Sequence, residues 1–248
     1  MSVQNPLITY PIVDDVEFIN LRNIGATHVV GDQYQNLFYD DFSLGVNVPW
    51  AKSVGTGGTL ARTTAAAEFS SGGAAFKWTS GVTISEVQTV ERHIGFLPDI
   101  KLVAFGVRFA ILDESPEYFR FILGKRDGTN FVRAVFDHFY TTNLWRYDTG
   151  GVGAENMTTL LTRDAHDGIA PPRWHNLLIV ADFQNNKYRT IIMDDNANGV
   201  ATIGAQPLRS SADATLPGTL SFGFEFKNTA APAAANVLID LAYGVVLD

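Results

Sequence analysis

The sequence predicts an all-β protein, a sandwich or a barrel of short strands. The 17 Phe and 8 Tyr against 3 Met, together with 22 Gly and 10 Pro, favour strands and turns over helices. From Leu37 onward, short runs of alternating apolar and polar residues are separated by Gly, Asp and Asn, the spacing typical of such folds. A chain of 248 residues is within the length that a single β domain can reach.

The composition excludes several classes of protein. An apolar fraction of 46% with 18% charged residues is that of a globular chain, which rules out disorder, collagen and coiled coil. The net charge of −8 offers no cluster of Lys and Arg for phosphate backbones, so we expect no nucleic-acid partner. Because the chain has no cysteine, disulfides, thiolate metal sites and cysteine nucleophiles are all excluded.

The sequence also bears on the location of the protein. The first residues lack the basic and apolar regions of a secretory signal, and no stretch reaches the ~18 apolar residues of a membrane span. We therefore expect a protein without membrane association. It is expected to be made in the cytoplasm and to stay there, or to leave it inside a larger particle or by lysis.

Residues 1–36 are predicted to form an N-terminal arm, because Pro6, Pro11 and Asp14-Asp15 interrupt apolar residues that follow no period of 2 or 3.6. This segment is too apolar to remain a dissolved tail. We expect it to dock on a neighbouring subunit of a homo-oligomer, by extending a sheet or wrapping a surface. The alternative is that it folds back and shields an edge strand of its own domain.

Residues 37–248 are predicted to form one β domain. A stretch rich in Ala, Thr and Gly at residues 53–75 is predicted to be a long loop. Residues 101–112 follow as a half-buried strand, whose alternate apolar residues from Val103 to Ile111 face the core.

Six further strands are predicted at residues 118–125 and 131–140, 174–183 and 187–193, and 220–227 and 237–247. In the chain as a whole we expect at least nine strands and almost no helix. Between the first two, Asp127-Gly128 favours the positive φ angles of a tight hairpin. We expect one core shared by Phe105, Phe109, Phe121, Ile179, Phe224 and Ile239.

Three segments carry a family resemblance: Phe38-Tyr39-Asp40-Asp41-Phe42 followed by Trp50, residues 174–183 followed by Lys187-Tyr188 and Asp194-Asp195, and residues 237–242. They are similar to the opening strand, a "W-H-x-L-x-I-x-x-D" hairpin and the returning last strand of concanavalin A-like lectin and glucanase domains, including the laminin G-like group. The resemblance covers residues 37–248. It implies a jelly-roll β-sandwich of two curved antiparallel sheets, the concave one often carrying the site. Lectins, glycosidases, lyases and structural modules share this fold, so it assigns no activity.

Carboxylates in the pattern of a catalytic pair are missing. Glycosidases of this superfamily carry a Glu-x-Asp-x-x-Glu strand, which holds a nucleophile and an acid at working distance, and this sequence has none. Glu91 and His93 lie two apart on one strand face, as a lyase base and its orienting carboxylate would, but a solvated face explains them more simply. Glu225 beside Lys227 is interpreted as part of a surface ion pair. We expect a protein that is not an enzyme.

A candidate glycan-binding site lies at Asn143, Trp145 and Tyr147, which are two apart and so project to one side of a strand. Aromatic faces with a nearby amide suit a sugar ring. The alternative, which we favour, is that Trp145 and Tyr147 are core aromatics whose polar tips find partners.

A weaker candidate is a calcium site. Asp194, Asn196 and Asn198, with Gly199, match the opening of a calcium loop. The twelfth position is Ala205 rather than Glu, and strands rather than helices are predicted on both sides. A polar turn is therefore the simpler interpretation, and no other cofactor is expected.

Three functions stay open. The first is a non-catalytic structural or interaction module of a larger assembly, such as a virion coat, decoration or tail component, with glycan binding as an added property. It is favoured by the arm, by the lack of an export signal and by the absence of a polar cluster that demands chemistry. The alternatives are a carbohydrate-binding lectin, favoured by Trp145 and Tyr147, and a polysaccharide-cleaving glycosidase or lyase, favoured by the resemblance alone.

Overall fold

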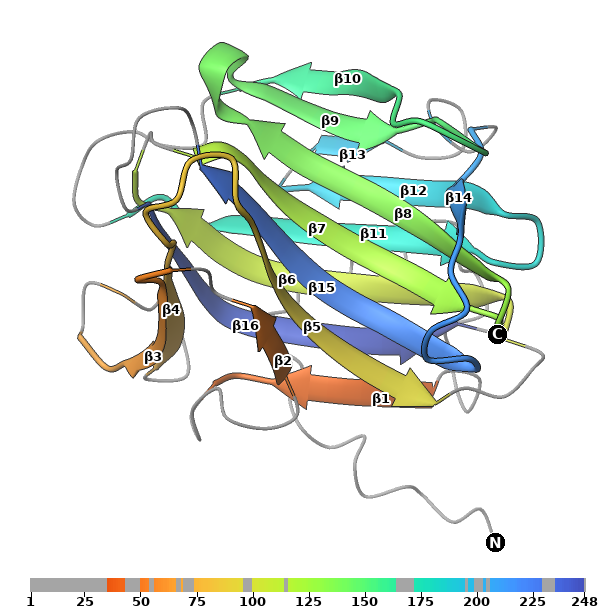
Figure 1. The fold of residues 1–248 in the computed structure, drawn as a ribbon, viewed down its shortest axis with the longest axis horizontal. Coiled ribbons are helices and arrows are strands. Elements are labelled where there is room, and N and C mark those ends of the chain that lie inside the picture. The colour runs from red at the N-terminus through yellow and green to blue at the C-terminus, as the bar shows by residue number, and fades with distance from the viewer. Residues whose placement is uncertain are drawn as a thin grey trace, which may run out of the picture.

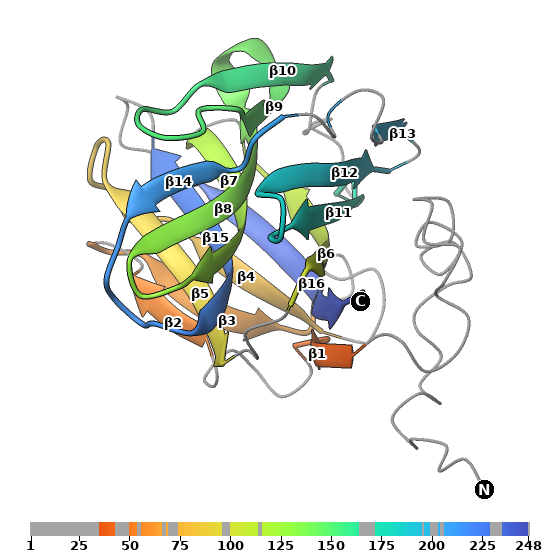
Figure 2. The ribbon, with the colours of Figure 1, turned by 90° about the vertical axis from the view of Figure 1, so that its right-hand side faces the viewer.

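The computed structural model describes residues 35–42, 50–53, 56–65, 68, 74–95, 100–113, 116–163, 172–194, 196–198, 203, 206–228 and 235–247. These residues form two antiparallel sheets that pack face to face (Figures 1 and 2). The prediction of an all-β sandwich is confirmed. Within the described ranges the only helical element is a 3-10 turn at Tyr140–Thr142, and no helix there is long and apolar enough to cross a membrane.

Sheet A contains eight strands: β1 (Gln35–Asp40), β3 (Thr59–Thr63), β4 (Ala75–Thr79), β6 (Leu102–Ile111), β11 (His175–Asp182), β12 (Lys187–Met193), β13 (Asn196–Asn198) and β16 (Asn236–Val246). Their order across the sheet is β13-β12-β11-β6-β16-β4-β3, and β1 pairs with β16. The predicted return of the last strand beside the first is thereby confirmed, since Asp40 pairs with Ala242 and Gln35 with Val246.

Sheet B also contains eight strands: β2 (Trp50–Ser53), β5 (Val87–Gly95), β7 (Pro116–Arg126), β8 (Asn130–Phe139), β9 (Leu144–Asp148), β10 (Met157–Thr162), β14 (Arg209–Ala212) and β15 (Thr219–Asn228). Their order is β10-β9-β8-β7-β15-β5-β2, and β14 pairs with one end of β8. In Figure 1 this sheet is the front layer, with the long strands β5, β7, β8 and β15 lying across sheet A.

The core lies between the two sheets and is rich in aromatic rings. The six residues predicted to share it belong to one cluster and are each at most 1% exposed: Phe105, Phe109, Phe121, Ile179, Phe224 and Ile239. Phe109 lies 4.6 Å from Phe121 between ring centroids, and Phe105 lies 5.7 Å from Phe224. Each of these pairs joins a strand of sheet A to a strand of sheet B, so the predicted inward faces are confirmed.

Two local predictions need correction. Strand β6 is buried on both faces rather than half-buried. Its outward residues Ala104, Gly106 and Ala110 are small, and the ring of Tyr243 occupies the space above Gly106. The fourth outward residue, Arg108, is 7% exposed and donates to Asn176 Oδ1 at 3.0 Å. The predicted loop at residues 53–75 contains β3, which pairs with β4 at the edge of sheet A. Its mostly exposed Thr, Ala and Arg side chains gave no apolar alternation to detect.

The predicted N-terminal arm falls almost entirely outside the described residues. The structure begins at Gln35 in β1, so the last two residues assigned to the arm, Gln35 and Asn36, pair with β16 instead. Docking of the arm on a neighbouring subunit stays a prediction.

Candidate functional site

Polar residues gather on the outer face of sheet B, opposite to the core. On β7, the inward residues Phe119 and Phe121 alternate with the outward residues Tyr118, Arg120 and Ile122. The antiparallel register then sets rows of outward side chains across the strands, perpendicular to the chain direction. One row runs Glu225, Arg120, Asp137, Arg146, and the next runs Lys227, Tyr118, Phe139.

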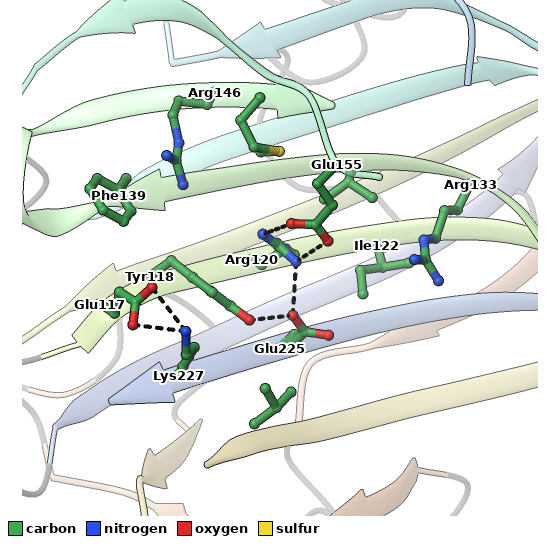
Figure 3. A pocket seen from close by; sticks show the side chains of 13 residues that line it. Glu117, Tyr118, Arg120, Ile122, Arg133, Phe139, Arg146, Glu155, Glu225 and Lys227 are labelled. Carbon is green, nitrogen blue, oxygen red and sulfur yellow. Dashed lines mark hydrogen bonds and ion pairs between the residues drawn. The ribbon is translucent and has the colours of Figure 1, made fainter. Parts of the chain in front are cut away.

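These rows enclose a pocket of about 440 Å³ on the outer face of sheet B (Figure 3). Its volume is within the range of small-molecule sites. Its lining comes from six strands, β5, β7, β8, β9, β10 and β15, and from the loop between β9 and β10. The lining residues are Val87, Glu117, Tyr118, Arg120, Ile122, Arg133, Val135, Phe139, Arg146, Glu155, Met157, Glu225 and Lys227.

Arg120 is the centre of the polar network in this pocket. Its Nη1 donates to Glu225 Oε1 and to Glu155 Oε1, both at 3.0 Å. Its Nη2 donates to Asp137 Oδ2 and to Glu155 Oε2, both at 3.2 Å. Arg120 is only 5% exposed, and a buried guanidinium of this kind is retained because carboxylates from three separate elements neutralise it.

The electrostatics of the pocket follow from this burial. Burial by itself would lower the pKa of Arg120, but Glu225, Asp137 and Glu155 raise it above its ordinary value, so the cation is permanent. Burial and the neighbouring Glu225 carboxylate raise the pKa of Tyr118 well above its usual value near 10. The phenol therefore stays protonated and donates to Glu225 Oε1 at 2.8 Å.

Aromatic rings complete the pocket, each in contact with a cation. The guanidinium carbon of Arg120 lies 4.2 Å from the ring centre of Tyr118, and that of Arg146 lies 4.0 Å from the ring centre of Phe139. Arg146 also holds Asp137 through two bonds of 2.9 Å. The result is a rigid lining in which flat rings alternate with fixed hydrogen-bonding groups.

A second polar group lies beside the pocket on the same face. His93 Nδ1 is 3.0 Å from Ser221 Oγ, and His93 Nε2 is 3.5 Å from Glu91 Oε2. Glu91 and His93 therefore share one face, as predicted. Arg126 donates to the same Ser221 oxygen and pairs with Asp213 at 3.1 Å. Burial, opposed by Glu91 and assisted by Arg126, lowers the pKa of His93.

The predicted glycan site at Asn143, Trp145 and Tyr147 is not an accessible surface. Trp145 is 0% and Tyr147 5% exposed, and both face the core, where Trp145 stacks on Phe136 at 5.6 Å. The indole nitrogen of Trp145 donates to a backbone carbonyl at 3.0 Å. Asn143 adopts the left-handed conformation at the end of the 3-10 turn. The core interpretation is therefore right, because the inward side of β9 carries these rings and the outward side carries Arg146.

The calcium candidates are only partly described. Both carboxylate oxygens of Asp194 already accept bonds, from Asn176 N at 2.8 Å and from His175 Nδ1 and Arg163 at 3.0 Å. Burial opposes ionisation of Asp194, but these partners outweigh it and lower the pKa of the carboxyl. Asn196 and Asn198 lie in β13, a strand rather than the expected turn, and their side chains lie outside the described residues. Among the described side chains, no three His, Asp or Glu are grouped as a metal site. Calcium stays a prediction.

The pocket was missed at the level of sequence. Glu225 was assigned to a surface ion pair with Lys227, whereas Glu225 binds Arg120 and Tyr118 on β7, and Lys227 binds Glu117 at 3.0 Å. The sequence does contain a signal for this pocket, namely the polar residues that alternate with the core phenylalanines along each strand. Tyr118-x-Arg120 and Glu225-x-Lys227 are the polar faces of strands whose phenylalanines were assigned to the core.

Comparison with known proteins gives a likeness in structure alone. No protein-family model matches the chain, and no curated protein matches it. An endo-β-1,4-glucuronan lyase from the fungus Trichoderma reesei superposes with a TM-score of 0.57 at 14% identity, over 85% of this chain and 95% of that one.

Two further structures superpose less well. A CBM2 module of the evolved Dit protein of Lactobacillus casei BL23 phage J-1 gives a TM-score of 0.49 at 10% identity, over 88% of this chain and 97% of that one. The exoplasmic/lumenal domain of VIP36, in a form bound to Ca²⁺ and Man3GlcNAc, also gives 0.49 at 11% identity, over 88% and 91%. The two sheets, the last strand beside the first and the likeness to the fungal structure show that the chain has the concanavalin A-like jelly-roll fold.

Proposed function

We propose that this protein binds a glycan in the pocket on the outer face of sheet B and does not cleave it. The observation that carries this proposal is the pocket itself, in which Tyr118 and Phe139 present rings beside fixed carboxylates and guanidinium groups. A ligand site generally combines apolar surface with a few convergent polar groups that fix orientation. Sugars need both, since their C–H faces pack on rings and their hydroxyls exchange hydrogen bonds with charged side chains.

The position of the pocket supports a chain-like ligand. The rows of lining residues run across β15, β7, β8 and β9. Between the polar rows and Arg133, the floor of the pocket is formed by Ile122 and Val135. Neighbouring strands are about 4.8 Å apart, so this strip spans roughly the length of a few linked sugars. The described lectin-like fold is compatible with such a ligand, but the fold alone assigns no function.

The chemistry of the pocket supports binding without cleavage. Tyr118 is held in its protonated form and donates to Glu225, so at neutral pH it is a hydrogen-bond donor and not a base. Glu225 and Glu155 both accept hydrogen bonds from Arg120, so neither carboxyl group is free to act on a glycosidic bond. A glycosidase needs one protonated and one free carboxyl group flanking the bond.

The neighbouring group at His93 supports the same conclusion. Ser221 is fully buried and its hydroxyl already accepts from Arg126, so it is not presented as a nucleophile. The Nδ1 of His93 is engaged with that same hydroxyl, and its Nε2 lies 3.5 Å from Glu91 Oε2. The structure named as a glucuronan lyase nevertheless makes cleavage the alternative to test.

A place in a larger assembly remains part of the proposal. A glycan-binding module is suited to a surface component of a particle, as predicted from residues 1–36. The role in an assembly has to be tested through the oligomeric state of the protein, because the part of the arm that precedes Gln35 lies outside the described residues.

The proposal is tested by retention of the protein on a panel of neutral and acidic polysaccharides. We expect binding to at least one, and loss of that binding in Tyr118→Ala, which removes the largest ring of the pocket. Tyr39→Ala is the matched control, because Tyr39 is 45% exposed on β1 of the other sheet. Lys227→Met, which changes a lining residue that is 25% exposed, tests the pocket again with less effect on folding.

Cleavage is tested on the same panel by assaying new reducing ends and unsaturated products. We expect neither. Turnover abolished by Glu225→Gln or Glu91→Gln would contradict the non-catalytic part of the proposal. Absence of binding to the whole panel would contradict the proposal itself.

A further inference from the structure

Arg133 is a cation of the pocket without a partner among the described residues. It lies on the outward face of β8 and lines the pocket, yet no carboxylate of the described chain forms an ion pair or hydrogen bond with it. Its guanidinium lies 4.9 Å from the ring centre of Phe131, which leaves its donors free. The other cations of the lining are neutralised, since Arg120 binds three carboxylates, Arg146 binds Asp137, and Lys227 binds Glu117.

The register of the sheet adds a second positive charge at the same place. Arg209 of β14 is paired directly opposite Arg133 of β8, an arrangement that is unfavourable for like charges. Arg209 is bound to the buried Asp148 at 3.1 Å, which compensates Arg209 but not Arg133. Burial, and after it the charge of Arg209, lowers the pKa of Arg133, and the opposing charges of Glu225 and Glu155 offset this only in part. An anion beside Arg133 would relieve this repulsion.

A carboxylate of the chain already shows which anion fits. Glu155 lies on the loop between β9 and β10 and meets Arg120 in a forked arrangement, with its two oxygens 3.0 and 3.2 Å from the two terminal nitrogens. The Glu155 side chain is 39% exposed, and its carboxylate also lies 3.8 Å from Arg209. It thus reaches over the pocket from the solvent side, between Arg120 and Arg209 (Figure 3 shows its bonds to Arg120).

We propose that the pocket is selective for a glycan that contains uronic acid, whose carboxylate binds Arg133 and competes with Glu155 for the guanidinium groups of the pocket. This inference rests on the proposed function, because it names the class of glycan that the same pocket binds. A planar carboxylate is favoured over other anions because Glu155 shows that this geometry suits the arginines of the pocket. The selectivity for a carboxylate comes from contacts within the pocket. The net charge of the whole protein, −8, repels polyanions at long range and does not contribute to it.

The test compares uronate-containing polysaccharides with their own carboxyl-reduced forms, which keep the linkage and lose the charge. The panel contains polygalacturonate, alginate and hyaluronan, each with its reduced form, together with dextran and dextran sulfate. Binding is measured by affinity electrophoresis and isothermal titration. We expect at least one uronate polysaccharide to bind, and its reduced form to bind about tenfold more weakly, as loss of a charge-assisted bidentate contact implies.

Single substitutions assign the effect to residues. Arg133→Met is expected to weaken uronate binding about tenfold, whereas Glu155→Gln is expected to strengthen it severalfold by removing the competing carboxylate. Arg189→Met is the matched control, because Arg189 is exposed on β12 of the other sheet. Should Arg133→Met fold poorly, Arg133→Lys keeps the charge without the fork and is expected to bind uronate more weakly than the wild type.

The outcomes separate this inference from the proposed function. Equal binding of native and reduced polysaccharides, or unchanged uronate binding in Arg133→Met, overturns the inference and leaves glycan binding standing. Equal binding of dextran sulfate and uronates overturns the preference for carboxylate. Binding to none of the polysaccharides, neutral ones included, overturns the proposed function and the inference together.

Discussion

Tyr188 connects the two sheets through a single hydroxyl group. It lies on β12 of sheet A, is 1% exposed, and reaches across the core to β8 and β9 of sheet B. On one side of β8, residues 130–133 pair with β14 and residues 136–139 pair with β9, which leaves a gap at Val135. The Tyr188 hydroxyl accepts from Val135 N at 3.0 Å and lies 2.9 Å from the carbonyl oxygen of Asp148. It therefore supplies the hydrogen bonds that a neighbouring strand would otherwise make.

Replacement of Tyr188 by Phe tests this role at the residue scale. We expect a loss of about 1–3 kcal/mol in the free energy of unfolding, because the amide of Val135 is left buried without a partner. Urea unfolding measures the change. Tyr39→Phe is the control, since this ring is 45% exposed and a surface change of this kind stays within about 0.5 kcal/mol. Equal stability of the two variants would contradict the role assigned to the hydroxyl.

At the scale of elements, the β7–β8 hairpin positions most of the pocket. Its turn is closed by Asp127, whose carboxylate accepts from Asn130 N at 2.7 Å and from Thr129 N at 2.8 Å. Gly128 adopts φ +95°, a conformation that L residues rarely take, so the predicted Asp-Gly turn is confirmed. The turn sets the register that places Arg120 opposite Asp137 and Gly124 opposite Arg133.

The turn makes a pH-dependent contribution to stability. The bonds from Asn130 and Thr129 lower the pKa of Asp127 below its ordinary value of 3.8. A folded pKa below the unfolded one means that the contribution is present above pH 3.8 and is lost as the pH falls through the folded value. The stability difference between wild type and Asp127→Ala is therefore expected to shrink on acidification, as measured by urea unfolding at a series of pH values.

A control for this hairpin keeps the amides and changes the neighbouring side chain. Thr129→Ala retains the N–H group that Asp127 binds, so its pH dependence is expected to match that of the wild type. A difference between wild type and Asp127→Ala that is constant from neutral to acid pH would rule out the proposed role of the carboxylate.

At the scale of the whole molecule, the two faces of sheet B are used for different purposes. The inward face supplies aromatic rings to the core shared with sheet A. The outward face supplies the pocket (Figure 3). Because successive residues of a strand point to opposite faces, the same strands carry both the core rings and the residues that line the pocket. The core supports the site, since the rows of the pocket stay in place only while the inward rings hold the strands.

The arm belongs to this scale as well. We expect deletion of residues 1–30 to leave a folded protein of reduced oligomeric state, because so apolar a segment is predicted to dock on a neighbouring subunit. Mass in solution and circular dichroism of full-length and truncated chains measure this. An unfolded truncated chain, or a full-length monomer at every concentration, would instead place the arm in the fold of its own subunit.

Residue patterns along the chain predict the class of fold, the inward faces of the long strands and the hairpin at Asp127-Gly128. These depend on residues close together in the chain, since alternation and turn chemistry are local. Even the ends of β12 match the predicted range 187–193. Edge strand β3 escaped prediction because its exposed residues carry no apolar signal.

The position of the site, in contrast, depends on how the strands pack and pair. Alternation gives each strand two faces, and packing places Trp145 and Tyr147 in the core while Arg146 and its row lie on the outer face of sheet B. Arg120 meets Asp137, Glu155 and Glu225, which are 17, 35 and 105 residues away in the chain. No local pattern relates such residues, because their distances follow from strand order and register across the sheet. The pocket exists because these strand pairings bring residues that are distant in the chain to one face of sheet B.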